Sequence, residues 1–168
     1  MLPEVAHYID RIDDLRRQIS DLISQVPVEG LNWRPIDGAD DHATNSLAVM
    51  AAHVAGAEQH WLHEVIGRQP PTRQRDREFK TVVEDASSLM QKFAENAETS
   101  RQILAALNAD DLAGSREVDG RIVPVRWAIL HVIDHTALHL GHMQITYQLW
   151  NSGQAVAAPR WYQRLPNL

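Results

Sequence analysis

Four histidines recur on a single predicted helix near the end of the chain: His131, His135, His139 and His142. Because an α-helix turns about 100° per residue, these side chains fall within about 80° of one another around the axis. Two imidazoles four residues apart are separated by about 6 Å along the helix and can converge on one metal ion. The spacing therefore predicts a metal site on this face, with a further ligand supplied by another part of the chain.

The spacing alone leaves several ligand sets open. On the last helix the available pairs are His131 with His135, His135 with His139, and His139 with His142. A predicted helix in the first half of the chain offers His53, His60 or Glu64. A lone histidine on an apolar face is usually a hydrogen-bonded core residue, but several unpartnered imidazoles on one seam would each cost about 1–3 kcal/mol. Metal ligation would satisfy these nitrogens and stabilise the neutral ring.

Four amphipathic segments are predicted to form the helices that position these residues. Apolar side chains recur every three or four positions over about 3–26, 45–67, 78–107 and 124–153. Asn45 or Ser46 can cap the second helix and Gly67 can end it, while Pro124 opens the last one. Strand signals are few, and Asp119-Gly120 predicts a tight hairpin turn. The pattern favours an all-α fold, a four-helix bundle, in a single domain of residues 1–168.

The predicted helices are joined by long connections. About 20 residues rich in proline, glycine and aspartate follow the first helix, and Leu31 and Trp33 are expected to anchor them to the bundle. The C-terminal tail after Gly153 has no helical periodicity. In this tail, Trp161 and Tyr162 are expected to dock on the body or on a partner subunit.

Composition excludes several classes of function. With 16 Lys and Arg against 22 Asp and Glu, the formal charge is −6, and no basic surface is predicted for nucleic acid. No stretch approaches the length of a membrane span, and the N-terminal residues lack the apolar run of a signal peptide, so a cytoplasmic protein is expected. The chain has no cysteine, so thiol chemistry would need a thiol from a second molecule.

Three sequence elements resemble one known family. They are Trp33-Arg34-Pro35, the run 46–62 that contains His53 and Trp61, and the run 134–141 (DHTALHLG) followed by Gln144. On these elements the chain resembles the DinB/YfiT-like superfamily of metalloenzymes, related to bacterial thiol S-transferases, over roughly residues 5–152. The last element is similar to the final-helix pattern of that superfamily, an acidic residue followed by His-x3-His-x-Gly. His142 departs from it, because glutamine more often follows the glycine.

The resemblance implies a specific site and a class of partner. One histidine of the second helix and two of the last would hold a divalent metal ion, here His53, His135 and His139. The metal would be zinc, nickel or iron, since imidazole suits each of them. Similar proteins often form homodimers and use a low-molecular-weight thiol such as mycothiol, bacillithiol or glutathione.

The hypothesis from the sequence is a metal-dependent thiol transferase acting on a small electrophile. Three neutral imidazoles leave coordination positions open, as in catalytic sites, and an open metal can bind a thiol as its reactive thiolate. His142 is the catalytic candidate, as a proton shuttle, although it can equally bond a loop carbonyl. Arg34 can hold an anionic substrate or be solvated. The alternatives are a metal-dependent hydrolase with Glu58 or His142 as base, and a non-enzymatic metal-binding or stress-response bundle.

Overall fold

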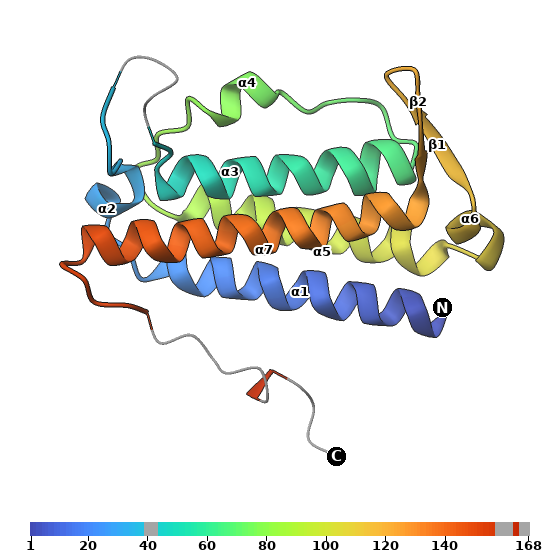
Figure 1. Ribbon diagram of the computed structural model, residues 1–168, viewed down its shortest axis with the longest axis horizontal. Helices are drawn as coiled ribbons and strands as arrows, with labels where there is room; N and C mark the ends of the chain where they lie inside the picture. The colour runs from blue at the N-terminus through green and yellow to red at the C-terminus, as the bar shows by residue number, and fades with distance from the viewer. Residues whose placement is uncertain (39–43, 157–162, 165–168) are drawn as a thin grey trace.

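The computed structural model describes residues 1–38, 44–156 and 163–164. Helices make up most of this part of the chain, and four long helical segments run side by side (Figure 1). The long segments are α1 (Pro3–Ser24), α3 (Leu47–Glu58) continued by the π-helix η1 (Gln59–Ile66), α5 (Ser87–Ala106) and α7 (Val125–Trp150). The shorter elements are α2 (Val28–Asn32), α4 (Arg75–Glu78), α6 (Ala109–Ala113), β1 (Ser115–Val118) and β2 (Arg121–Pro124). The prediction of a helical fold is confirmed at this level, with one hairpin in addition.

Local sequence signals account for most element boundaries. Pro3 opens α1 at a position where its missing N–H is not needed. The Ser46 hydroxyl caps α3 by accepting a hydrogen bond from the backbone N–H of Val49 at 3.2 Å. Asp119 and Gly120, with φ of 49° and 72°, form the two-residue turn between β1 and β2, which confirms the predicted hairpin.

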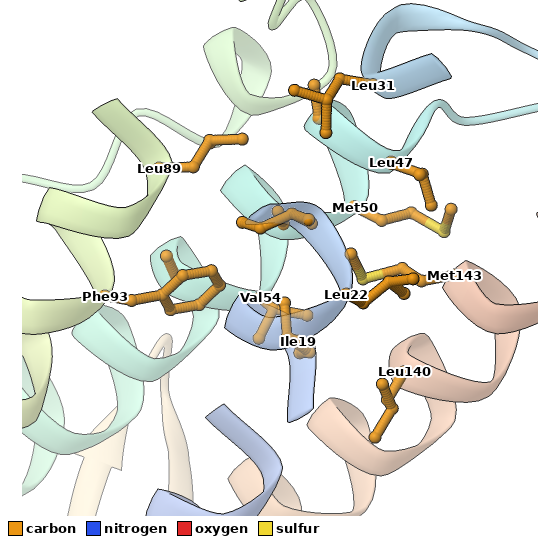
Figure 2. Close-up of a cluster of buried hydrophobic side chains, with 14 of the residues drawn as sticks. Ile19, Leu22, Leu31, Leu47, Met50, Val54, Leu89, Phe93, Leu140 and Met143 are labelled. Carbon is orange, nitrogen blue, oxygen red and sulfur yellow. The ribbon is translucent and has the colours of Figure 1, made fainter. Parts of the chain in front are cut away.

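The hydrophobic core lies between the four long segments. Figure 2 shows buried side chains of α1, α3, α5 and α7 meeting around Leu22, Val54, Phe93 and Met143. Leu31 of α2 is 1 % exposed and packs into the same cluster, so its predicted anchoring role is confirmed. The long segments are therefore fixed relative to one another by apolar burial, which sets the spacing between α3 and α7.

The prediction of one helix over about 78–107 is wrong. Glu78 ends the short helix α4, and α5 begins only at Ser87. Between them, the Asn32 side chain donates to the carbonyl of Val83 at 2.8 Å and accepts from its N–H at 3.0 Å. These bonds replace the helical partners of Val83, and the β-branched run 81–83 has a low helix propensity. The segment that contains α4 runs back along the outside of α3 (Figure 1).

Gly67 follows η1 as predicted, but for a different reason. Its backbone is right-handed, with φ of −75°, and the left-handed residue is the next one, Arg68, with φ of 55°. A Cβ at Gly67 would come within 2.6 Å of the Ile103 side chain, so close packing requires glycine here. The predicted docking of Trp161 and Tyr162 lies outside the described residues.

None of the helices in the described part of the chain combines the length and the apolar character that crossing a bilayer requires.

Candidate metal centre

Three of the predicted histidines meet between two packed helices. His53 of α3 faces His135 and His139 of α7, and one nitrogen from each ring lies within 4.8 Å of the other two. The Nε2 atoms of His53 and His135 are 3.0 Å apart. Ring centroids are separated by 4.9 Å for His53 and His135, 5.0 Å for His53 and His139, and 4.5 Å for His135 and His139. The structure thus joins a local i, i+4 pair to a histidine about 80 residues earlier in the chain.

These separations suit a shared metal ion. Nitrogens bound tetrahedrally at 2.0–2.1 Å from one ion lie about 3.3 Å from each other. The 3.0 Å approach of His53 and His135 is close to that value, and rotations about the side-chain torsions bring a nitrogen within 4.8 Å into range. The donor set is three imidazole nitrogens with no carboxylate among them.

Two of the three rings carry a nitrogen without a partner. The Nδ1 atoms of His135 and His139 are buried and lack a hydrogen bond within the described residues. Burial, reinforced by the neighbouring histidines, lowers the pKa of His135 to about 3 and that of His139 to about 4. Both rings are therefore neutral at physiological pH, which is the form that binds metals. The orphaned nitrogens and the charge state both fit a metal centre.

A carboxylate behind His53 fixes the orientation of its ring. His53 Nδ1 lies 2.9 Å from Glu78 Oε2, and Arg73 donates to both oxygens of Glu78, at 2.7 and 2.8 Å. Burial alone would raise the pKa of Glu78, but the hydrogen bonds from Arg73 and His53 lower it on balance. The ionised carboxylate can only accept, so Nδ1 of His53 donates to it, and Nε2 is the nitrogen that lies toward His135.

Glu78 and Arg73 did not emerge from the sequence as site residues. They lie in the stretch between η1 and α5, whose path the apolar periodicity did not predict. The sequence signal near His53 that relates to this carboxylate is Gly56, one turn later on α3. A Cβ at Gly56 would collide with the Glu78 carboxylate, so the glycine leaves room for that group to reach His53.

Two other candidates from the second helix take structural roles. His60 Nδ1 lies 3.0 Å from Glu64 Oε2, and the other oxygen of Glu64 accepts from the backbone N–H groups of Thr72 and Arg73 at 2.7 and 2.8 Å. Burial would raise the pKa of Glu64, but these hydrogen bonds lower it to about 2. Glu64 thereby ties the segment after η1 to the helix, and neither residue joins the histidine cluster.

The remaining histidines of α7 flank the cluster. The ring of His131 lies 5.6 Å from that of His135, and the ring of His142 lies 5.6 Å from that of His139. His131 is half-buried between aromatic neighbours, whereas His142 is exposed. Asp134, which precedes His135, is also exposed. The catalytic role of His142 stays a prediction, and its exposure at the edge of the cluster is compatible with proton exchange.

Glu58 is engaged elsewhere, which weakens its candidacy as a hydrolytic base. Arg16 of α1 donates to Glu58 Oε1 at 2.5 Å, and the Ser100 hydroxyl of α5 donates to the same oxygen at 2.5 Å. His63 extends this network, because its Nε2 lies 3.0 Å from Ser100 Oγ. This buried network joins α1, α3, η1 and α5 and holds the scaffold together.

Arg34 contacts a residue that packs against the cluster. Its guanidinium donates to the Phe79 carbonyl at 3.5 Å, and the Phe79 ring packs 5.0 Å from that of His53. Arg75 lies over the same Phe79 ring, 4.9 Å from its centroid. Arg34 is thus linked through Phe79 to the His53 side of the cluster, and its role in holding an anionic substrate stays a prediction.

Comparisons with known proteins identify a family and two similar folds. The family model described as mycothiol-S-transferase matches residues 10–150. A DinB-like protein from Bacillus cereus has a similar crystal structure, with a TM-score of 0.70 and 14 % identity over 92 % of this chain and 95 % of that one. A conserved protein from Enterococcus faecalis gives a TM-score of 0.68 and 16 % identity, covering 90 % and 99 % of the two chains. At these identities the two structures support the fold only. No curated protein matches the sequence.

Proposed function

The chain belongs to the mycothiol-S-transferase family, and from this premise we propose that it joins a low-molecular-weight thiol to a small electrophile at a divalent-metal centre. His53, His135 and His139 are the proposed ligands. The observation that carries the proposal is the convergence of three imidazole nitrogens within 4.8 Å, two of the rings having an orphaned buried Nδ1. The family description favours mycothiol as the thiol, with bacillithiol and glutathione as alternatives.

The metal supplies a Lewis-acidic centre that favours the thiolate form of a bound thiol. The chain's own residues prepare that centre. Glu78 holds Nδ1 of His53 as a donor, so that Nε2 is the nitrogen available to a metal ion. Burial keeps His135 and His139 neutral. His142, exposed beside His139, is the proposed carrier of the thiol proton to solvent. Because the chain has no cysteine, the sulfur comes from the second molecule.

The proposal extends to architecture and assembly. We assign the four long helical segments to a four-helix bundle that forms a single domain. We also expect a homodimer, because α7 carries a row of exposed apolar side chains: Leu130, Leu138, Ile145 and Leu149, 45–59 % exposed. Gly141 lies within this row, and a Cβ there would meet nothing within 4 Å, so close approach of a second helix can account for the glycine. We expect the enzyme to work in the cytoplasm, where small thiols are kept reduced.

Metal analysis of single variants tests the ligand assignment. Purified without a histidine tag, the protein is expected to contain about one divalent ion per chain, and His135→Ala or His139→Ala is expected to lose it while keeping its helical circular dichroism. His142→Gln is the matched control on the same helix and should retain the ion. Full metal content in either alanine variant would overturn the assignment.

The reaction is tested with the thiol and 1-chloro-2,4-dinitrobenzene. Formation of the thioether is expected to require both the thiol and the metal. Product formation from water when the thiol is omitted would point to hydrolysis instead and refute the transferase proposal.

A further inference from the structure

Next to the histidine cluster lies a group of aromatic side chains that the metal centre does not use. Trp61 of η1 and Trp127 and His131 of α7 contact one another, and we call these three residues the aromatic wall. Ring centroids are 5.4 Å apart for the two tryptophans, 5.3 Å for Trp61 and His131, and 4.9 Å for Trp127 and His131. The last pair is stacked, with an interplanar angle of 4°.

The aromatic wall faces solvent. Trp127 is 49 % exposed, and Trp61 and His131 are half-buried. Large aromatic side chains usually bury most of their area, and exposed apolar clusters mark binding sites more often than chance. The wall is also continuous with the candidate metal centre, because the His131 ring lies 5.6 Å from that of His135. A small molecule resting on the wall therefore has its near end beside the histidine cluster.

The backbone under Trp61 is unusual. Trp61 belongs to η1, where the helix widens from α to π geometry over Gln59–Ile66. π-Helical turns are rare and frequently occur at functional sites, where they change the direction in which a side chain points. Trp61 of η1 lies against Trp127 and His131 of the facing helix. The feature independently marks this end of the α3–α7 seam as specialised.

From these observations we infer that the aromatic wall binds the electrophile and that the preferred electrophile is a flat, electron-poor aromatic ring. Indole and imidazole faces are electron-rich, so they stack favourably on a ring depleted by nitro, carbonyl or halogen groups. This inference rests on the proposed function for the reaction that follows binding. The thiolate sulfur forms a bond to the ring carbon, the carbon–halogen bond breaks, and the halide leaves with its electron pair. The proton of the thiol has already passed to solvent.

Binding can be measured without the reaction. The probe is 1,3-dinitrobenzene, which has the ring and nitro groups of the substrate but no leaving group. Its dissociation constant is measured by titration calorimetry on the metal-free protein, so the result does not depend on the histidine ligands. We expect Trp127→Ala to weaken binding about fivefold or more, the loss of one aromatic contact. Trp127→Phe should recover part of the affinity. Val82→Ala, outside α7 and η1 and 78 % exposed, is the control and should leave the constant unchanged.

Kinetics on the metal-loaded protein give a second readout. Trp127→Ala should raise KM for 1-chloro-2,4-dinitrobenzene while KM for the thiol and the metal content stay as in wild type. An unchanged dissociation constant for the probe in both Trp127 variants would overturn the inference. So would sedimentation showing that Trp127→Ala dissociates a dimer, because the wall would then be an interface between subunits. Should the triad variants keep their metal while Trp127→Ala loses the probe, the proposed function fails and the aromatic binding site stands.

Discussion

Replacing Glu78 tests how far the metal affinity depends on a residue that touches no metal. The carboxylate accepts three hydrogen bonds, one from His53 Nδ1 and two from Arg73, at 2.7–2.9 Å. Glu78→Gln keeps the shape of the side chain, but only one of its two terminal atoms is an oxygen that can accept from Arg73 or His53. A neutral acceptor also forms a hydrogen bond about half as strong as an ionised one. If that oxygen stays on His53, the ring keeps its orientation and loses basicity.

The expected loss of affinity follows from this geometry. Substitutions behind a metal-binding histidine typically weaken metal binding about 10–100-fold, or about 1.4–2.7 kcal/mol. Glu78→Gln should fall near the lower end, and Glu78→Ala, which removes the acceptor altogether, near the upper end. Gly56→Ala should resemble Glu78→Ala, because its new methyl group occupies the space of the carboxylate while leaving Glu78 chemically intact.

The assay is competition for zinc against a chromophoric chelator at pH 7.5. Glu84→Gln, a substitution of an exposed glutamate outside the site, is the matched control and should bind like wild type. Urea unfolding of the metal-free variants separates weakened binding from weakened folding. Equal zinc affinity in wild type, Glu78→Gln and Gly56→Ala would refute the role assigned to the carboxylate.

Two further outcomes follow from the buried groups. The folded-state pKa values of His135 and His139 are about 3 and 4, below the unfolded value of about 6.5. At pH values between the folded and unfolded pKa, the unfolded chain therefore binds more protons than the folded one. Metal-free protein should therefore lose stability as pH falls from about 6.5 toward 4, and its melting temperature should fall with it. A His135→Gln, His139→Gln double variant should show a shallower fall. Parallel curves of melting temperature against pH for the two proteins would contradict this explanation. Arg16→Met should lower the free energy of unfolding by about 3–5 kcal/mol, because it leaves the Glu58 carboxylate buried and unpaired. Urea denaturation measures that loss, and the variant should keep full metal content, in contrast to the ligand variants.

The sequence by itself determined the parts of the site that depend on one helix. His135 and His139 share a face because helical geometry repeats every 3.6 residues, and apolar periodicity fixed the existence of the last helix. The cap at Ser46 and the turn at Asp119-Gly120 were likewise readable, since each depends on the chemistry of a few neighbouring residues.

Tertiary structure decided which residues complete the site. Periodicity left His53, His60 and Glu64 equivalent as partners, and only the packing of α3 on α7 brings His53 to the pair. Glu78 and Arg73 reach His53 because the chain between η1 and α5 runs back along α3. That path depends on Asn32, about 50 residues earlier, which holds the backbone of Val83. Contacts between residues so distant in the chain leave no periodic signal, because they arise from packing and hydrogen bonding between elements and not from the geometry of any one of them.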